Sequence, residues 1–234
     1  MVTILMNTFN ERPDWLCQAL DSYLANDIEK QIIVSTLETD KNLSLLKTYG
    51  NKIEIHLSDI SQHPGRGAEG IYYQINNALS KVKGEWFTFI SSNDNVMKDK
   101  LTNELTACQR NNKLVCYSDF FEMSEDGIRG KKRTFFDYDY KRHLTGNFVS
   151  DASLVHVSLL KKYSPFRCNE FGNYAHWDFW LRIFEGEGNV FHYMKTPTFE
   201  YRLNNDSQHI LRRNNPDEIE KFKIKYQKLI QNRK

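Results

Sequence analysis

Short apolar runs alternate with amphipathic segments along the first half of the chain. Four of these runs have the length of buried strands, and they cover residues 2–6, 31–36, 52–57 and 85–90. Between them, apolar positions recur at helical spacing, which predicts helices over residues 13–26, 41–50 and 71–82. Strands that alternate with helices favour parallel pairing, so the sequence predicts an α/β fold with a Rossmann-like, mostly parallel sheet flanked by helices.

The second half of the chain has a less regular pattern. It predicts a helix, a strand, a hairpin and a further helix, at residues 100–110, 113–123, 124–135 and 174–185. Two more strands are predicted at residues 190–195 and 198–203. The polar and aromatic stretch that leads to residue 148 shows no clear period and predicts a loop over the site. We therefore expect a smaller sheet and helix region beside the first sheet.

A basic amphipathic helix is predicted at the C-terminal end, in residues 210–234. Pro216 suits a first helical turn, and an apolar stripe that includes Phe222 and Tyr226 runs beside several lysines. Such a helix could lie on an anionic membrane surface, or pack on its own domain and keep a solvated basic face. We favour the packed helix and keep peripheral membrane contact as the alternative.

Composition excludes several classes of protein. Apolar residues make up 40% of the chain and charged residues 26%, as in soluble globular proteins. The net charge of +2 is far below the basic excess of nucleic-acid-binding proteins, so we expect no nucleic acid partner. The four cysteines lack metal-ligand spacing, the first apolar run is shorter than that of a secretion signal, and we expect no membrane span. We therefore expect a cytoplasmic protein, with a place at a membrane surface as the alternative.

Each predicted strand of the first half leads into a polar loop. These loops are residues 7–11, 35–40, 65–70 and 91–95. Because the carboxyl ends of parallel strands meet at one edge of a sheet, we expect the four loops to form a single pocket. In the first loop, Thr8, Asn10 and Glu11 could bind a ribose or a base edge. The alternative is that Asn10 or Asp14 caps the following helix.

Two of the loops carry groups suited to a diphosphate or a cation. Arg66 lies between two glycines, so its guanidinium and the exposed backbone could approach a phosphate together. A flexible turn with a solvated arginine is the alternative. Asn93 and Asp94 could each give an oxygen ligand to a divalent cation, although such cations normally take two or more carboxylates beside a phosphate.

Several short motifs follow one another in order between residues 2 and 209. They are Thr8-Phe9-Asn10-Glu11, the pair Gly70 and Asn76, Gly84-Glu85-Trp86, the segment 164–190 and Tyr201-Arg202. In this order they resemble the inverting family-2 glycosyltransferases of the GT-A fold. The resemblance implies transfer of a hexose from a nucleoside-diphosphate sugar, with UDP as the expected nucleotide, to a hydroxyl of a glycan, lipid or protein, with inversion. It also implies one domain over residues 1–209, with a nucleotide-binding half (1–112) and an acceptor-side half (113–209).

The resemblance also suggests which residues form the site. Together with the loop residues above, it gives nucleotide-sugar contacts at Thr8, Asn10, Glu11, Thr36, Arg66, Gly70, Asn76, Ser92 and Asn93. It implies Mn²⁺ or Mg²⁺ as cofactor, with candidate ligands Asn93, Asp94 and His209.

Three positions depart from the family pattern. The acidic pair that reads the nucleotide base is replaced by Ser35-Thr36, and the DxD motif falls on Ser91 and Asn93. The acceptor-side acidic pair falls on Ala175-His176. We therefore keep a second function in view, a catalytically weak or inactive module that binds a nucleotide sugar or a glycan. A nucleotidyltransferase is less favoured, because the acceptor-side helix and the Tyr-Arg turn belong to sugar transferases.

An inverting transfer needs a base that deprotonates the acceptor hydroxyl. The resemblance places the catalytic carboxylate at or near His176, whereas Asp178 is the ordinary carboxylate base in this segment. We predict Asp178 as the base, with His176 as an alternative base or substrate contact. The structural alternative for Asp178 is an ion pair with Arg182, one helical turn further on.

Overall fold

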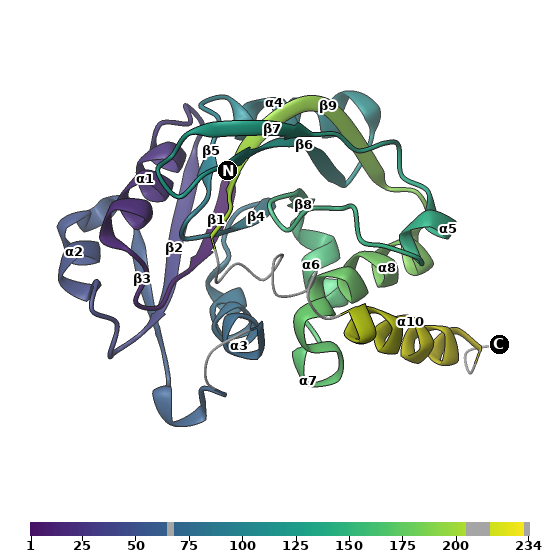
Figure 1. The fold of residues 1–234 in the computed structure, drawn as a ribbon. Helices are drawn as coiled ribbons and strands as arrows, with labels where there is room; N and C mark the ends of the chain where they lie inside the picture. Colours follow the sequence, from purple (N-terminus) through teal and green to yellow (C-terminus); the bar gives the residue numbers. More distant parts are fainter. Residues whose placement is uncertain (65–67, 205–215, 232–234) are drawn as a thin grey trace.

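The computed structural model describes residues 1–64, 68–204 and 216–231 (Figure 1). Its strands are β1 (Val2–Asn7), β2 (Lys30–Leu37), β3 (Glu54–Ser58), β4 (Trp86–Ser91), β5 (Asn95–Val96), β6 (Val115–Met123), β7 (Arg129–Arg133), β8 (Leu154–His156) and β9 (Phe191–Arg202). Its α-helices are α1 (Pro13–Leu24), α2 (Leu43–Thr48), α3 (Ala68–Ala78), α4 (Lys100–Asn111), α5 (Tyr140–His143), α6 (Val157–Tyr163), α7 (Cys168–Phe171), α8 (Ala175–Glu187) and α10 (Pro216–Gln231).

The strands form one sheet with the order β3-β2-β1-β4-β8-β6-β9-β5, and β7 pairs with β6. The four strands of the first half are parallel to one another, and β6 is parallel to β9. The short pairings of β8, β5 and β7 with their neighbours are antiparallel. The predicted α/β fold is confirmed, and the acceptor-side strands continue the first sheet rather than forming a separate one.

The parallel register aligns the carboxyl ends of three strands. Asn7, the last residue of β1, lies opposite Ser35 of β2 and Ser91 of β4. Thr8 and Ser92 therefore leave the sheet at the same level, beside Thr36. Three of the four loops that the sequence assigns to one pocket thus begin along one edge.

Helices cover both faces of the sheet, which explains the continuous apolar runs of its central strands. On one face, Leu5 shares a core with Tyr72 of α3 and Trp180 of α8. On the other face, Ile4 shares a core with Leu16 of α1 and with residues of α4. In the view of Figure 1, α3 and α8 lie below the arch that β6, β7 and β9 form.

The strands expected at 190–195 and 198–203 form the single strand β9. Its pairing with β6 shifts register between Ser118 and Phe120 of β6, opposite the part of β9 that contains Pro197. Proline has no backbone N–H, so it interrupts the ladder without ending the strand. The alternation of apolar residues breaks at the same place, which is why the sequence suggests two strands.

Two smaller features lie in the region between β6 and β8. The predicted hairpin is confirmed, because β7 pairs antiparallel with β6 and Gly127 adopts the positive φ of 80° that glycine tolerates. The stretch expected to be a loop contains the short helix α5, where Asp139 accepts a hydrogen bond from the Arg142 N–H at 3.1 Å. A single turn has too few residues to show a helical period.

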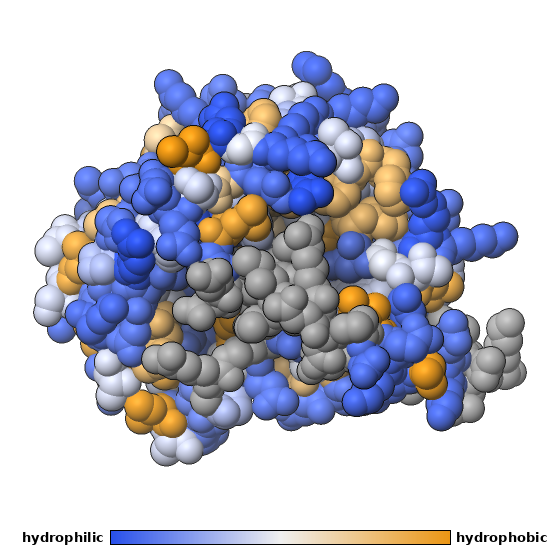
Figure 2. All heavy atoms as spheres, viewed as in Figure 1, coloured by the Kyte–Doolittle hydropathy of each residue, from blue (hydrophilic) through white to orange (hydrophobic). Residues whose placement is uncertain are grey.

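The C-terminal helix α10 packs on the domain. Phe222 and Tyr226 share an apolar cluster with residues of α7 and α8, and the rings of Phe222 and Trp177 lie 4.4 Å apart. This contact buries Phe222 and Tyr226 of the apolar stripe, as the favoured interpretation expects. No helix in the described ranges is long and apolar enough to cross a membrane. On the face drawn in Figure 2, hydrophilic residues dominate and hydrophobic ones form separate patches.

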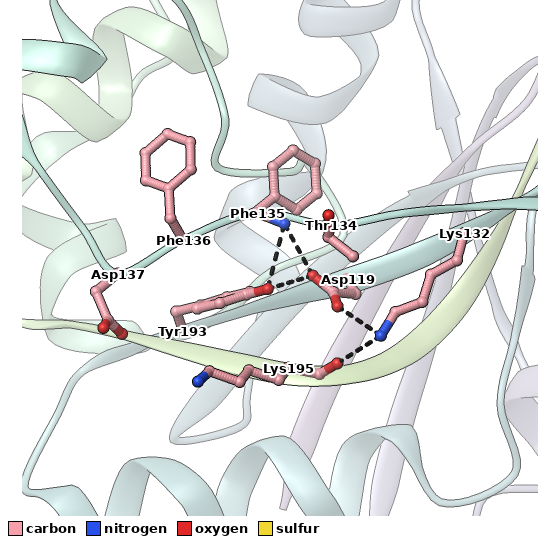
Figure 3. A pocket seen from close by; sticks show the side chains of 8 residues that line it. All are labelled: Asp119, Lys132, Thr134, Phe135, Phe136, Asp137, Tyr193 and Lys195. Carbon is pink, nitrogen blue, oxygen red and sulfur yellow. Dashed lines mark hydrogen bonds and ion pairs between the residues drawn. The ribbon is translucent and has the colours of Figure 1, made fainter.

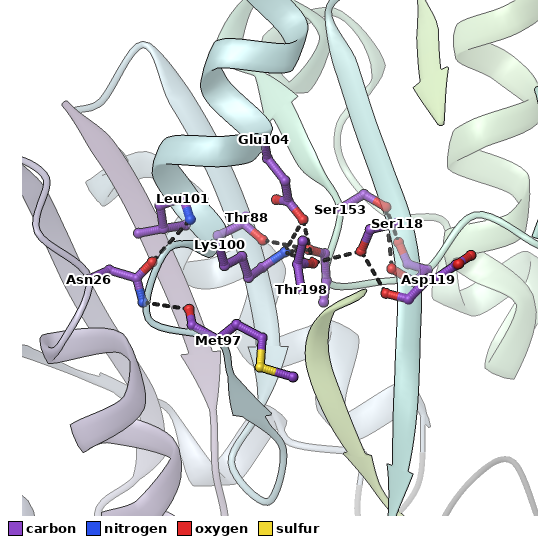
Figure 4. Close-up of polar contacts among 12 residues, drawn as sticks. Asn26, Thr88, Met97, Lys100, Leu101, Glu104, Ser118, Asp119, Ser153 and Thr198 are labelled. Carbon is purple, nitrogen blue, oxygen red and sulfur yellow. Dashed lines mark hydrogen bonds and ion pairs between the residues drawn. The ribbon is translucent and has the colours of Figure 1, made fainter. Parts of the chain in front are cut away.

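A buried ion pair connects α4 to the centre of the molecule (Figure 4). Lys100 Nζ lies 2.5 Å from Glu104 Oε1, and both side chains have no exposed surface. Lys100 also donates to the Ala152 carbonyl at 2.7 Å, and Thr198 of β9 donates to Glu104 at 2.7 Å. The pair therefore ties α4 both to β9 and to the segment that precedes β8.

Removing one charge of this pair should be far more harmful than removing both. Lys100→Met leaves Glu104 buried without its cation, and we expect the free energy of unfolding to fall by about 3–5 kcal/mol. The double variant Lys100→Met/Glu104→Leu should recover much of that loss. Urea denaturation measures both values. The exposed pair of Lys83 and Glu54 is the control, and Lys83→Met should cost about 1 kcal/mol or less. A double variant as unstable as the sum of its singles would contradict this expectation.

Candidate active site

The loop after β1 is held against the loop after β2. Asn10 adopts a positive φ of 55°, and its Oδ1 accepts a hydrogen bond from the Lys41 N–H at 2.9 Å. The first residue before α1 is Arg12, and its side chain makes no capping bond. Asn10 and Asp14 therefore do not cap this helix, so that alternative is wrong. Asn10 instead fixes the distance between two loops of the candidate pocket.

Glu11 connects the loop after β1 with the loop after β4. Its Oε2 accepts a hydrogen bond from Ser92 Oγ at 3.3 Å, and its Oε1 accepts one from the Arg12 N–H at 2.9 Å. Thr8, at the end of β1, has a buried hydroxyl for which the described residues provide no hydrogen-bond partner. The strand ends thus bring Thr8 and Ser92 to one edge of the sheet, where Ser92 contacts Glu11, and a pocket formed by these residues stays a prediction.

The end of β2 carries a carboxylate that sequence reasoning missed. Thr36 Oγ1 donates to Asp40 Oδ2 at 2.6 Å, and Asp40 is 4% exposed. Its other oxygen accepts from the Asn42 N–H at 2.8 Å. Asp40 lies in a polar turn, and no motif or spacing distinguishes it from its neighbours. Its position shortly after the end of a predicted strand is the one feature of the sequence that could have indicated it.

Arg202 fixes the loop after β4. Its N–H donates to Asp94 Oδ1 at 2.8 Å, and its Nε donates to the Asn93 carbonyl at 2.8 Å. The guanidinium also donates to Gln18 Oε1 at 2.6 Å and lies over the Trp15 ring, 5.0 Å from its centre. Arg202 is 1% exposed, so the loop is held by a buried cation from the far end of β9. The sequence shows the Tyr-Arg turn but not this contact.

The described residues do not fit a metal ion at this loop. Asn93 Oδ1 accepts from Ser91 Oγ at 2.6 Å, and one oxygen of Asp94 is taken by Arg202. Burial raises the pKa of the Asp94 carboxyl to about 7, against the opposing effect of Arg202. Within the described ranges, no group of three or more His, Cys, Asp or Glu side chains is arranged to hold a metal ion. Arg66, the predicted phosphate contact, and His209, the predicted metal ligand, lie outside the described residues.

Asp178 is held between two arginines. It has no exposed surface, and its Oδ2 accepts from Arg167 Nε and Arg182 Nε, each at 2.9 Å. Its Oδ1 contacts the Arg167 guanidinium as well. The ion pair with Arg182 is the structural alternative that the sequence offers. Arg167 was missed, because it lies eleven positions away on another element.

His176 is the second residue of α8 and lies in an aromatic environment. Its ring stacks on Phe89 with centres 4.0 Å apart, and its Nδ1 lies 2.6 Å from Tyr72 Oη. The same Nδ1 lies 3.3 Å from Asp151 Oδ1. The side chain of Asp151 is 48% exposed, whereas that of His176 is 4% exposed. Asp151 was missed as well, since the segment around it has neither a period nor a motif.

Gly70 and Asn76 lie on α3, on either side of Gln74, whose carbonyl accepts a hydrogen bond from Ser35 Oγ of β2 at 3.0 Å. Asn76 Nδ2 donates to the Phe166 carbonyl at 2.9 Å, and its Oδ1 accepts from the Phe166 N–H at 2.9 Å. Both ends of this amide are therefore used to join α3 to the segment before α7. Gly70 is buried in the first turn of the helix.

A hollow of about 400 Å³ lies between β6, β7, β9 and the segment after β7 (Figure 3). Its floor is Asp119, which accepts from Tyr193 Oη at 2.5 Å and from the Phe135 N–H at 3.0 Å. Lys132 Nζ lies 2.9 Å from the other carboxylate oxygen. Asp119 thus joins three segments of the acceptor-side half, and the hollow is separate from the strand ends that carry Thr8 and Ser92.

The raised pKa of Asp94 should make stability depend on pH. In the folded protein the carboxyl keeps its proton to about pH 7, whereas in an unfolded chain it loses it near pH 3.9. The folded state binds more protons in this window, so the free energy of unfolding should fall as pH rises, by up to about 1.4 kcal/mol per pH unit. Asp94→Asn keeps an acceptor for Arg202 but cannot titrate. Urea denaturation from about pH 4 to 8 should show a smaller fall for the variant, and parallel curves would contradict the buried carboxyl.

Comparison with known proteins gives one family and a consistent set of structures. The glycosyl transferase family 2 model matches residues 3–164. The poly(ribitol-phosphate) beta-N-acetylglucosaminyltransferase TarS of Staphylococcus aureus is 23% identical over 133 residues, which are 55% of this chain and 22% of that protein. The chain therefore spans about a fifth of the length of this curated relative.

Solved structures show the same fold. A crystal structure of residues 1–349 of S. aureus TarS with UDP-GlcNAc has a TM-score of 0.64 and 16% identity, covering 90% of this chain and 60% of that one. The mannosyltransferase PcManGT of Pyrobaculum calidifontis, with GDP-Man and Mn²⁺, has a TM-score of 0.60 and 12% identity, covering 90% and 59%. These likenesses confirm the expected GT-A type of fold. Because the family model covers well over half of the chain, this protein belongs to glycosyl transferase family 2.

Proposed function

We propose that this protein transfers a hexose from a UDP-sugar to a hydroxyl of a glycan, lipid or protein, with inversion at the sugar. One observation carries the proposal. The polar ends of β1, β2 and β4 lie at one level of the sheet, and Glu11 is hydrogen-bonded to Ser92 across it. Ligands of α/β sheets bind at such an edge. The TarS structure that shares this fold holds UDP-GlcNAc, which supports a UDP-linked donor.

The nucleoside would contact the loops after β1 and β2. Thr8 offers a buried hydroxyl, and Asn10 and Glu11 offer an amide and a carboxylate beside it. At the end of β2, Asp40 accepts from Thr36 and supplies a carboxylate where the family pattern has an acidic pair. Ribose and uracil present several donors and acceptors, so this set of neutral and acidic groups suits them.

The diphosphate would lie near Ser92 and Asn93. A cation or a basic side chain must balance its charge as the nucleotide leaves. Asn93 Oδ1 and Asp94 Oδ1 already accept hydrogen bonds within the protein, so this loop does not present them as ligands for a cation. A phosphate contact from Arg66 stays a prediction. Binding of Mn²⁺ or Mg²⁺ with His209 as a ligand stays a prediction as well. The Mn²⁺ in the mannosyltransferase structure supports testing the ion.

The acceptor side of the site would be built around the start of α8. His176 belongs to this region because its Nδ1 lies 3.3 Å from the half-exposed Asp151. Asp178 contacts two arginines with both oxygens, so it is suited to hold α8 in place rather than to take a proton. We therefore give His176 and Asp178, the two candidate bases that the sequence predicts, different roles.

One observation favours the second candidate function, a module that binds a nucleotide sugar without turnover. Burial and the Arg202 contact keep Asp94 from acting as a free ligand, and Asp178 is closed off by its ion pairs. If no cation or basic side chain balances the charge of the diphosphate at this loop, the protein could bind UDP-sugars and release no UDP. The two candidates agree on binding and differ on turnover.

UDP should raise the thermal midpoint of the protein. Binding to the folded state alone adds about 2.7 kcal/mol of stability at a concentration one hundred times the dissociation constant. A thermal-shift panel of UDP, GDP and UDP-sugars, each with and without Mn²⁺, should show a shift for UDP and its sugars and a smaller one for GDP. No shift with any nucleotide would refute the donor site. Release of UDP from any UDP-sugar would refute the inactive module.

The hydroxyl of Ser92 should contribute to UDP affinity. Ser92→Ala removes a group that is 4% exposed and bonded to Glu11 at the candidate edge, and a lost hydrogen bond weakens binding about two- to tenfold. The matched control is Ser80→Ala. Ser80 is exposed, and the next residue, Lys81, contacts Gln31 near the start of β2, at the opposite edge. Calorimetric titration with UDP should give weaker binding for Ser92→Ala alone, and equal affinities would contradict the placement.

A further inference from the structure

We infer that Asp151 is the base that deprotonates the acceptor hydroxyl, and that His176 positions it. This inference rests on the proposed glycosyl transfer and adds the residue that would perform its proton step. Asp151 lies in the segment between α5 and β8, whereas His176 lies on α8. The carboxylate that α8 lacks at position 176 is thus supplied from another part of the chain.

The backbone beside Asp151 is rigidly placed. The carbonyl of Ala152 accepts from Thr88 Oγ1 of β4 at 3.2 Å and from the buried Lys100 Nζ at 2.7 Å. Ser153 closes the turn, since its Oγ donates to the Ser150 carbonyl at 2.6 Å. A base must be held in one geometry to act, and these bonds fix the turn to the sheet and to α4.

The side chain of Asp151 contacts His176 and is also open to solvent. It is 48% exposed, so an acceptor hydroxyl can reach it, while its Oδ1 stays 3.3 Å from His176 Nδ1. Asp178 has no exposed surface, and both of its oxygens contact arginines. Among these two carboxylates near the start of α8, Asp151 alone can touch a substrate in this arrangement.

His176 is itself held in one orientation. Its ring stacks on Phe89 at 4.0 Å and packs beside Phe166 at 4.8 Å, and Tyr72 Oη lies 2.6 Å from its Nδ1. A ring fixed on three sides can direct Nδ1 toward Asp151. His176 therefore acts as a positioning residue for the carboxylate.

Asp151 also lies within electrostatic reach of the donor loop. After burial, the negative charges of Asp151 and Glu11 both contribute to the raised pKa of Asp94. Glu11 is hydrogen-bonded to Ser92 at the edge where the nucleotide sugar would bind. The region between Glu11, Ser92 and Asp151 is thus bounded by the donor loops on one side and by the proposed base on the other.

The proton step balances without a further reactant. A carboxylate oxygen of Asp151 takes the proton of the acceptor hydroxyl, and the acceptor oxygen bonds to the anomeric carbon. The bond from that carbon to the diphosphate oxygen breaks, and its electron pair leaves with the nucleoside diphosphate. Asp151 then returns its proton to solvent, to which it is open.

The test compares release of UDP from a UDP-sugar by wild type and variants, with water as the accepting hydroxyl when no other acceptor is supplied. Asp151→Asn should lower kcat by about 10²–10⁴-fold, the usual contribution of a general base, with KM for the donor unchanged. It should also keep the midpoint shift given by UDP. Asp151→Glu keeps a carboxylate in a displaced position and should lose less activity. Asp99→Asn, at an exposed carboxylate that makes no capping bond, is the matched control and should keep wild-type activity.

The role of His176 has its own readout. His176→Asn retains an N–H donor near the position of Nδ1, and His176→Leu removes it. We expect a lower kcat for the leucine variant, partial rescue by asparagine, and an unchanged KM for the donor in both. A purely structural role would instead lower the thermal midpoint of both variants alike without separating their kcat values.

The outcomes separate this inference from the proposed function. An active wild type with an equally active Asp151→Asn would overturn the inference alone. So would a folded Asp178→Asn variant that loses activity while Asp151→Asn keeps it. A wild type that binds UDP but releases none from any UDP-sugar would overturn glycosyl transfer, and the inference with it.

Discussion

The parallel pairing of β1 with β2 on one side and β4 on the other is the constraint on which the candidate site depends. Asn7 lies opposite both Ser35 and Ser91, so the next residues leave the sheet at one level. Hydrogen bonds then join the loops, from the Lys41 N–H to Asn10 and from Ser92 to Glu11. A slip of one residue in either pairing would turn these side chains to the other face.

The site carries most of its charge in internal contacts. Arg202 donates to the loop after β4, and Arg167 and Arg182 enclose Asp178. Such buried pairs hold loops and helices in place, because separating one partner would leave an uncompensated charge. Asp151, in contrast, is half exposed and lies beside His176. The carboxylates of the chain therefore differ in whether a substrate can reach them.

Much of the fold and part of the site follow from the sequence alone. Strand ends are visible as apolar runs that stop at polar residues, and this placed Thr8, Glu11 and Ser92 at one edge. Contacts between distant segments leave no such pattern. Arg167 lies eleven positions from Asp178, and Asp151 reaches His176 from another element, so neither pair has a spacing that could reveal it. The two strands predicted at 190–195 and 198–203 likewise form the single strand β9.

A crystal structure of the protein with a UDP-sugar tests the placement of the site most directly. We predict that the nucleotide lies at the ends of β1, β2 and β4, in contact with Ser92, with the anomeric carbon facing Asp151. A nucleotide bound instead in the hollow between β6, β7 and β9, on the floor formed by Asp119, would contradict it.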